Sequence, residues 1–328
     1  MKNRITLLKI FMFQFFFFGI LIFFHLNTTY AETFPNHVVK IIVPYLSGGS
    51  ADAQVRFLAT ELQSQWGQPV VIENKPGAGT TVGAAYVAAS KADGYTLYVA
   101  STSHTITPSL YKNLSYDAVY SYEPITMISS SPFLVSIKAD SPLNSVQDLI
   151  NLAKSNPGKM SWSSSGVGGG PHLSGEILKS TTSVNTIHIP FNGFSPSVNA
   201  VIGGHVDYVF SDITVLNLIR SGELKALAVT SPQRSSLLPN IPTFIESGFP
   251  SVQILNWSSI LAPAGTPKEI TNFLNNSISL ALKKASIKEK YEKLGFIPQG
   301  SNQEDLLKFL KSEVEKYSEI IRSAKIQL

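Results

Sequence analysis

Three times between residues 38 and 110, an apolar run gives way to a turn of small residues and then to a helical pattern. The apolar runs are Val38–Val43, Val70–Glu73 and Tyr95–Ala100. Buried strands that alternate with helices are typical of a parallel sheet with helices on its faces. In such a sheet the turns that follow the strands lie together at one edge, and ligands bind in the crevice there. The pattern therefore predicts an α/β fold with a ligand site formed by these turns.

The same order of strand, turn and helix returns in residues 132–230. The expected strands are Phe133–Ile137, Lys159–Ser164, Thr186–Pro190, Val206–Phe210 and Ala226–Thr230, and the expected helices include 145–153 (capped by Ser145), 172–180 and 196–202. A proline-rich loop follows over 231–250, and then a strand that ends near Ala262. Thr266–Glu269 and Ser301–Glu304 have the spacing of capping boxes, so each is expected to begin a helix. We expect these last helices to pack on the first unit.

The first turn is placed to bind an anion. Pro44 ends the strand, Gly48 and Gly49 form a tight turn, and Ser50 is expected to cap a helix that begins at Ala51. A strand that leads through glycine into a helix directs several backbone N–H groups, and the positive end of the helix dipole, at one point. A carboxylate or a phosphate fits such a point.

Residues 1–31 have the composition of a secretory signal peptide. Lys2, Arg4 and Lys9 precede an apolar run over 10–24, and Thr29–Ala31 offers small residues for cleavage. The apolar run is long for a signal peptide, so an uncleaved membrane anchor is the alternative. Cleavage would leave an exported chain, and we expect it in the periplasm.

Removal of residues 1–31 leaves a nearly neutral chain. Three of the 26 basic residues lie in this segment, which leaves 23 against 22 acids. No basic patch with interleaved aromatic residues occurs, so nucleic acid is not an expected partner. The chain has no cysteine, and its histidines show no metal-ligand spacing. We expect a monomer that needs neither a metal nor a cofactor.

The segment Gly77–Gly83 has the look of a dinucleotide-binding fingerprint, because it follows a strand and opens a helix. It has one residue too many for the strict spacing, and no acid stands about twenty positions further on at a strand end. Gly79 and Thr80 can instead allow close approach of a smaller anion. The glycines can also serve only the tight turns.

Four side chains near the predicted turns have two interpretations each. His104 and His172 lie beside turns of small residues, where each can donate to a ligand or simply brace its loop. Tyr45 and Phe191 each end an apolar strand, so each can contact the ligand or belong to the core.

Two acids also follow predicted strands. Asp52 lies in the first turn of its helix, which the helix dipole explains, and its charge would repel an anion unless water or a cation intervened. Asp212 is the better candidate to bind a polar or amino group of the ligand. No G-x-S-x-G elbow and no triad occurs, so catalysis is not expected. An exported hydrolase that uses Ser50 or Ser103 is the alternative from another class.

A set of short stretches, in order along residues 35–328, matches a known family. They are Val43–Tyr45 with Gly48–Ser50 and Asp52, Glu73–Gly79, Asp93–Leu97, Gly168–Leu173 with Gly175 and Glu176, Ile189–Gly193 with Pro196, Gly203–Asp207, Ala226–Ser231 and Ala262–Pro267. Through them the chain resembles the extracytoplasmic solute receptors of the tripartite tricarboxylate transporter group, also called the Bug family.

This resemblance implies a two-lobed periplasmic-binding fold of type II, in which each lobe is a mainly parallel sheet flanked by helices. Residues 32–131 and 232–328 would form one lobe and residues 132–231 the other. Such receptors close on a small carboxylate, which can be an organic acid, an amino acid or a related metabolite, and present it to membrane permease subunits. A receptor that reports to a membrane sensor kinase is the alternative.

The resemblance also implies that Tyr45–Asp52 and Gly166–His172 are the ligand-binding loops, one from each lobe. With the neighbouring turns, the expected ligand-binding residues are Tyr45, Gly48, Gly49, Ser50, Ala51, Asp52, Gly79, Thr80, Ser103, His104, Gly166, Gly168, Gly169, Gly170, His172, Phe191, Asn192 and Asp212. The chain departs from the usual family residues at Ser47, Thr80, Asn192, Ala200 and Ser211. These departures lie in ligand-facing loops and leave the identity of the ligand open.

Overall fold

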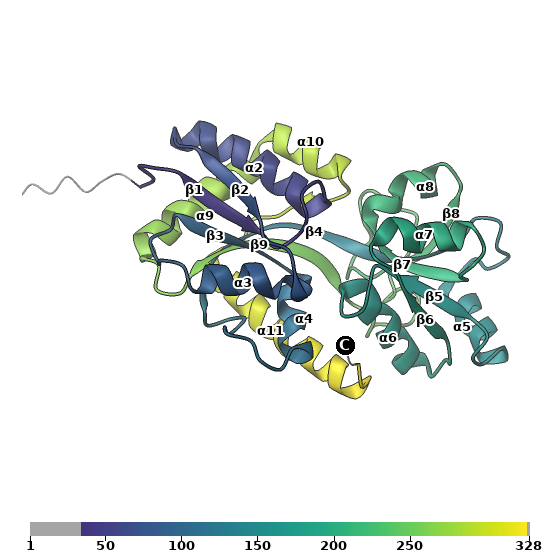
Figure 1. The fold of residues 1–328 in the computed structure, drawn as a ribbon. Coiled ribbons are helices and arrows are strands. Elements are labelled where there is room, and N and C mark those ends of the chain that lie inside the picture. The colour runs from purple at the N-terminus through teal and green to yellow at the C-terminus, as the bar shows by residue number, and fades with distance from the viewer. Residues whose placement is uncertain (1–33, 327–328) are drawn as a thin grey trace, which may run out of the picture. The chain divides into compact units, whose positions relative to one another are not determined.

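Strands and helices alternate along most of the chain (Figure 1). The computed structural model describes residues 34–326. The strands are β1 (Val39–Val43), β2 (Val70–Asn74), β3 (Thr96–Ser101), β4 (Tyr122–Lys138), β5 (Ser161–Ser164), β6 (Ile187–Pro190), β7 (Tyr208–Asp212), β8 (Leu224–Val229), β9 (Leu255–Pro263) and β10 (Ile297–Pro298). The helices are α2 (Ser50–Trp66), α3 (Thr81–Ala88), α4 (Thr102–Leu110), α5 (Val146–Ser155), α6 (Gly170–Thr182), α7 (Phe194–Ile202), α8 (Leu216–Arg220), α9 (Lys268–Lys283), α10 (Ala285–Lys293) and α11 (Gln303–Ser323), with the 3₁₀ turns η1 (Ala78–Thr80) and η2 (Ile213–Val215).

The strands form one hydrogen-bonded path in the order β2-β1-β3-β9-β4-β7-β5-β6, and β8 and β10 pair with β4 off this path. Strand β1 pairs in parallel with β2 and β3, and β5 pairs in parallel with β6 and β7. Antiparallel pairs of β3 with β9, β9 with β4 and β4 with β7 join these two parallel halves. The predicted α/β class is therefore confirmed. The sheet is mixed and not mainly parallel as expected, because the pairs made by β4 and β9 are antiparallel.

Strand β4 is much longer than the sequence pattern indicated. The pattern predicted a strand that begins at Phe133, whereas β4 already begins at Tyr122. Its first part contains Pro124, Pro132 and three consecutive serines, which are residues typical of turns and strand edges. The pairing with β9 shifts register twice along this part, and such irregularities accommodate residues that fit poorly into a regular ladder. Tertiary pairing therefore overrode the local composition.

Strand β4 also carries the chain from one parallel half to the other. Residues 122–132 pair with β9, and residues 133–138 pair with β7 and β8. A large core cluster likewise extends from Ile106 of α4 and Tyr317 of α11 to Trp162 of β5. The expected lobe boundaries lie after residues 131 and 231. Strand β4 continues across the first boundary and the core cluster extends over both, so these boundaries stay a prediction. The C-terminal helices pack as expected: α9 and α10 lie against α2, and α11 lies against α4 and β4 (Figure 1).

The side-chain hydrogen bonds of Ser145 and Thr266 show whether these residues cap the helices that they were predicted to begin. Ser145 caps α5 as predicted, because its Oγ accepts from the N–H of Asp148 at 3.1 Å. The predicted cap at Thr266 is wrong. Helix α9 begins at Lys268, and the hydroxyl of Thr266 donates to the carbonyl of Pro263 at 2.7 Å. The hydroxyl that the capping box would have used therefore donates to a carbonyl at the end of β9 instead.

The predicted cap of α11 is wrong by one residue. Asn302, and not Ser301, caps the helix, because its side chain accepts from the N–H of Asp305 at 2.7 Å. The hydroxyl of Ser301 accepts instead from the N–H of Met127 in β4 at 3.0 Å. A contact 174 residues away in sequence thus decided where this helix begins.

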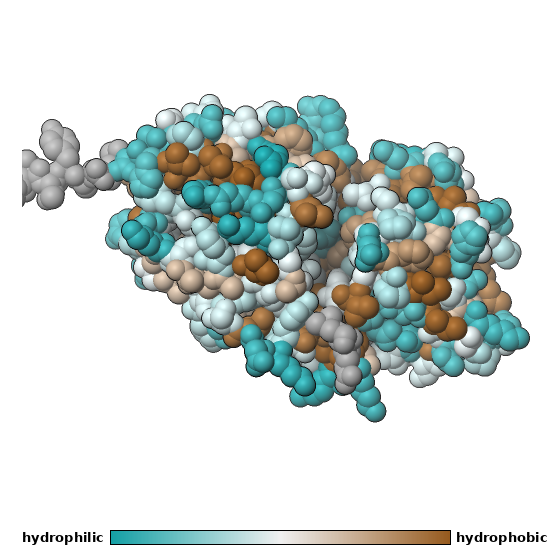
Figure 2. Space-filling model, in the orientation of Figure 1, coloured by the Kyte–Doolittle hydropathy of each residue, from teal (hydrophilic) through white to brown (hydrophobic). Residues whose placement is uncertain are grey.

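Within residues 34–326, no helix combines the length and the apolar character needed to cross a bilayer. The signal peptide expected over residues 1–31 lies outside the described residues. On the face seen in Figure 2, hydrophobic residues form several separate groups among hydrophilic ones. This is the ordinary pattern of a protein surface, since scattered apolar side chains need no partner.

Helix α6 packs closely on β5 because Gly175 has no side chain. A Cβ atom at this position would lie 2.2 Å from Cη2 of Trp162, whose indole is fully buried. Trp162 belongs to the core of the second parallel half, together with Tyr208 and Phe210. A side chain at position 175 would therefore have to displace this indole.

We expect Gly175→Ala to lower the free energy of unfolding by about 1 kcal/mol. Overpacking typically costs about 1–3 kcal/mol, and here it outweighs the gain of about 1 kcal/mol from alanine in a helix. Urea denaturation measures the difference. Ser180→Ala on the exposed side of the same helix is the control, with a change within about 0.5 kcal/mol. A Gly175→Ala protein as stable as the parent would show that Trp162 moves aside without loss.

Candidate functional site

Two loops with similar backbone angles at their last two residues lead into helices α2 and α6. The first loop (residues 44–49) follows β1, and the second loop (residues 165–169) follows β5. Gly48 and Gly168 occupy equivalent positions, with φ of +86° and +81°. Only glycine adopts this region readily, so the two turns require glycine at these positions.

The N-cap of each of these helices is also a glycine. Gly49 has φ −75° and ψ 170°, and Gly169 has φ −87° and ψ 168°. Neither helix has a side-chain cap, so the prediction that Ser50 caps α2 is wrong by one residue: Ser50 is the first residue of the helix. A glycine cap leaves the N–H groups of the first turn without the partner that a serine or aspartate would supply.

A side chain from the first turn of each helix fixes its loop. The carboxylate Oδ2 of Asp52 accepts from the N–H of Gly48 at 2.9 Å, and Nδ1 of His172 accepts from the N–H of Gly168 at 3.1 Å. In both loops the two partners are four residues apart. This bond uses the N–H of Gly48 or Gly168 and holds in place the N–H groups that follow it in the same loop.

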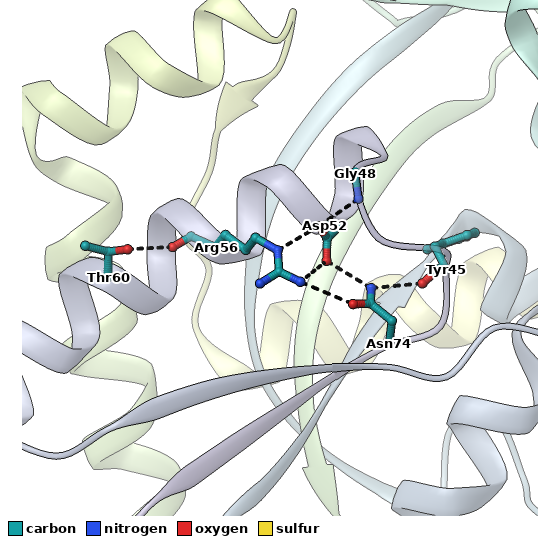
Figure 3. A network of polar contacts seen from close by, with 6 residues as sticks. All are labelled: Tyr45, Gly48, Asp52, Arg56, Thr60 and Asn74. Atoms are coloured by element: carbon teal, nitrogen blue, oxygen red, sulfur yellow. Dashed lines mark hydrogen bonds and ion pairs between the residues drawn. The ribbon is translucent and has the colours of Figure 1, made fainter.

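Asp52 is the centre of a polar network beneath the first loop (Figure 3). Arg56 donates to both of its oxygens, from Nε at 2.8 Å and from Nη2 at 3.0 Å. Asn74 of β2 donates through Nδ2 to Asp52 and to the carbonyl of Tyr45, each at 2.9 Å. Burial raises the pKa of Asp52, but the hydrogen bonds from Arg56, Gly48 and Asn74 outweigh burial and hold this pKa below its usual value. The carboxylate is therefore ionised and turned to its own loop.

The second loop is held against a stack of rings. The His172 ring stacks on His188 with 4.4 Å between centroids, and His188 stacks on Trp162 at 4.1 Å. Nε2 of His188 lies 2.8 Å from Oγ of Ser164. Burial lowers the pKa of His172, and it lowers that of His188 to about 3. Both rings are therefore neutral at pH 7, and Nδ1 of His172 is available to accept from the loop.

A cavity of about 230 Å³ lies where helices α2, α4 and α6 begin. These helices follow the parallel strands β1, β3 and β5, so the cavity lies at the carboxyl ends of the strands, where ligands bind in such sheets. It is lined by Tyr45, Gly49, Ser50, Ala51, Gln54, Ser101, Thr102, Ser103, Phe133, Ser165, Gly169, Gly170, Pro171, Phe194, Asp212, Asn256, Ser258 and Phe296.

The cavity is rich in backbone donors and poor in charge. Several lining N–H groups donate to no acceptor within residues 34–326, namely those of Gly49, Ser50, Ala51, Gly169 and Gly170. The positive ends of the α2 and α6 dipoles add to these donors. No lysine, arginine or histidine from the described part of the chain lines this cavity, and the charged lining side chain is Asp212. Such a lining can bind an anion through backbone dipoles.

Tyr45 connects the first loop with the start of α4. Its hydroxyl lies 2.6 Å from Oγ of Ser101, the N-cap of that helix. Burial raises the pKa of Tyr45, although hydrogen bonds with Ser101 and Ser103 oppose the shift. The phenol is therefore a neutral hydrogen-bonding group in the wall of the cavity.

The structure brings many of the expected ligand-binding residues to this cavity, namely Tyr45, Gly49, Ser50, Ala51, Ser103, Gly169, Gly170 and Asp212. A second cavity of about 120 Å³ also contains Ser103 and Gly169 in its lining, and it is lined in addition by the expected residues Gly79, Gly166 and Gly168. Contact of these residues with a ligand stays a prediction.

The other expected residues lie outside both cavities. They are Gly48, Asp52, Thr80, His104, His172, Phe191 and Asn192. Gly48, Asp52 and His172 form the hydrogen bonds that fix the loops, Thr80 is buried in η1, and Asn192 is exposed. Phe191 packs against the core cluster that contains Val198 and Ile213. His104 is completely buried, and its Nε2 donates to the carbonyl of Ala118 at 2.8 Å.

Some lining residues were not indicated by the sequence. Gln54 lies one helical turn beyond Ser50 on the same face of α2, so helical periodicity could have indicated it. Asn256 on β9 and Phe296 next to β10 come from the C-terminal third of the chain. No local motif connects them with the glycine loops, because long-range strand pairing places them there.

Comparison with known proteins shows which family the chain matches. A family model described as the tripartite tricarboxylate transporter family receptor matches residues 54–326. The chain is 33% identical over 301 residues to Protein BugT from Bordetella pertussis (strain Tohama I), with 91% of this chain and 92% of that protein covered. The resemblance stated from the sequence motifs is therefore confirmed.

Solved structures are similar over nearly the whole described chain. The periplasmic binding protein BugD has a TM-score of 0.77 and 34% identity, with 90% of this chain and 99% of that chain covered. Rpa4515 of R. palustris, solved with adipate, has a TM-score of 0.79 and 31% identity, with the same shares covered. The predicted two-lobed periplasmic-binding fold of type II is confirmed by these similarities.

We expect Asp52→Ala to lower the free energy of unfolding by about 2 kcal/mol, because it leaves the N–H of Gly48 and the amide of Asn74 without their acceptor. Hydrogen exchange should also show the Gly48 amide at least about tenfold less protected. Asp148→Ala is a matched control, since its Oδ2 accepts from the N–H of Asn144 at 3.0 Å with the same spacing, but at an exposed site. The control should lose less stability and leave Gly48 unchanged, and equal effects would contradict the central role of Asp52.

The buried His104 predicts how stability depends on pH. Burial lowers its pKa to about 4, against about 6.5 in an unfolded chain. The unfolded state therefore takes up a proton first as the pH falls below about 6.5, so His104 should remove about 2 kcal/mol of stability between pH 7 and pH 5. Urea denaturation at both pH values measures this loss.

His104→Gln should reduce the loss of stability between pH 7 and pH 5 by about that amount, whatever its effect at pH 7. His205→Gln is the control for the loss of a histidine, because His205 is exposed. The same pH dependence in the His104→Gln protein and in the parent would contradict a neutral, buried His104.

Proposed function

Because this chain belongs to the tripartite tricarboxylate transporter receptor family, we propose that it is a periplasmic solute-binding receptor that captures a small carboxylate between two lobes. The lobes would be residues 32–131 with 232–328, and residues 132–231. The receptor would deliver its ligand, as a monomer, to the membrane permease subunits of a transporter of this type. Residues 1–31 would be the signal peptide that directs it to the periplasm.

The free backbone donors of the two glycine loops carry this proposal. The N–H groups of Gly49, Ser50 and Ala51 come from one parallel half, and those of Gly169 and Gly170 come from the other. Both sets line one cavity that contains no basic side chain from residues 34–326. A carboxylate has two oxygens with about four acceptor positions, so it can accept from both loops at once. Its binding would then favour the closed arrangement of the lobes.

Similar proteins support the choice of ligand class. Rpa4515, which is 31% identical, was solved with adipate, and adipate is a carboxylate. The cavity of about 230 Å³ suits a small metabolite better than a drug-sized ligand, whose pockets are typically about 300–1,000 Å³.

The lining of the cavity supports binding and not hydrolysis. Ser50 and Ser103 both line it, but no histidine or lysine of the described chain lines it with them. His104 donates to Ala118, and His172 accepts from the second loop. A serine nucleophile needs an adjacent base, and neither serine has one in this lining.

We expect Ser50→Pro to weaken carboxylate binding at least about tenfold more than Ser50→Ala does. Both changes remove the hydroxyl, but only proline removes the N–H, and a hydrogen bond to a charged group contributes about 1.5–3 kcal/mol. Proline suits the first position of a helix, and Gly49 before it already has the extended backbone that proline favours. Titration calorimetry with a panel of organic acids and amino acids identifies the ligand and measures both variants.

Ser50→Ala is the control for loss of the side chain, and thermal unfolding of both variants checks the fold. If Ser50→Pro binds as tightly as Ser50→Ala, the N–H of the first loop does not hold the carboxylate. If no carboxylate in the panel binds to the parent protein, the receptor function itself is contradicted.

A further inference from the structure

Asp212 is a buried carboxylate in a cavity that has no basic side chain from residues 34–326. It lies at the end of β7 and is only 2% exposed. Its Oδ1 accepts from the N–H of Thr214 at 3.1 Å and from the hydroxyl of the same residue. Within the described chain it forms no ion pair, whereas the equally buried Asp52 is paired with Arg56.

This arrangement is unfavourable for a ligand that carries only negative charge. The free N–H groups of the two loops attract a carboxylate into the cavity. The charge of Asp212 repels it, and little water remains in a small cavity to screen the two charges. Burial raises the pKa of Asp212, so its ionised form is costly, and no cationic side chain within residues 34–326 pairs with it; a cationic group on the ligand would favour the ionised form.

We propose that the ligand is an amino carboxylate whose ammonium group pairs with Asp212 while its carboxylate binds the N–H groups of the two loops. The proposal rests on the carboxylate receptor function and specifies its ligand class. Such a ligand brings one positive and one negative charge, and each meets its opposite in the cavity. Phe133, Phe194 and Phe296 line the rest of the wall and suit a short hydrocarbon body between the two charged groups.

The bond to Thr214 does not by itself explain an aspartate here. Asp117 forms a similar turn, with Oδ1 accepting from the N–H groups of Val119 and Tyr120 at 2.7 Å each, but Asp117 is exposed. Asparagine or serine would satisfy the N–H of Thr214 without bringing a charge into the cavity. The turn therefore needs an acceptor at position 212 but not the negative charge of an aspartate.

The test uses sets of three related compounds and titration calorimetry at pH 7. Each set contains one standard amino acid, the same molecule without its amino group, and the same molecule without its carboxylate. We expect one or more amino acids to bind, with both truncated compounds of the set at least about 30-fold weaker. Loss of one partner of a buried charge pair has an effect of this size.

Asp212→Asn keeps the shape of the side chain and an acceptor for Thr214 but removes the charge. In this variant the amino acid should bind at least about 30-fold more weakly, and the compound without the amino group should bind as well as or better than it does to the parent. Asp117→Asn is the matched control and should change neither affinity. Circular dichroism and thermal unfolding check that both variants fold.

Each other outcome has a separate meaning. If compounds without the amino group bind the parent as tightly as the amino acids, or if only organic acids without an amino group bind, the pairing with Asp212 is overturned while the carboxylate receptor stands. If Asp212→Asn leaves the preference for the amino group unchanged, the pairing is likewise overturned. If amines without a carboxylate bind as tightly as the amino acids, or if nothing binds, the carboxylate receptor itself is overturned, and this inference with it.

Discussion

The candidate site depends on one hydrogen bond that occurs twice, from the N–H of a loop glycine to a side chain four residues further on. Asp52 accepts it from Gly48, and His172 accepts it from Gly168. A loop with two successive glycines has much conformational freedom, which folding must restrict. The bond restricts that freedom and uses one N–H group. The groups that follow it are then held without a partner at the positive end of a helix.

The two loops use different chemistry for the same purpose. Asp52 is an ionised carboxylate supported by Arg56 and Asn74, whereas His172 is a neutral ring that stacks on His188. In both cases the supporting side chain lies outside the cavity. The cavity can therefore attract an anion through backbone dipoles alone, with no basic side chain from the described residues.

Local patterns in the sequence predicted the parts of this arrangement that depend on neighbouring residues. The glycine pairs, the helices that follow them and their place after apolar strands were all recognisable, because turn and helix preferences act over a few residues. Local patterns did not indicate the partners of His104. It follows a turn of small residues, as a ligand donor would, but the rings of Tyr98, Tyr116 and Tyr122 surround it and its Nε2 donates to Ala118. Those partners are brought together only by the fold.

By itself, the sequence determined the α/β class, the family and the two glycine loops, since each of these is written in residue spacing or in local backbone preference. Only the tertiary structure decided that Asp52 and His172 turn toward their loops, that β4 begins at Tyr122 in spite of its prolines, and that Asp212 shares a cavity with both loops. The reason is physical. The residues that bury or pair a side chain come from strands that are far apart in the sequence. The fold therefore decides whether a charge inside a cavity is left unpaired.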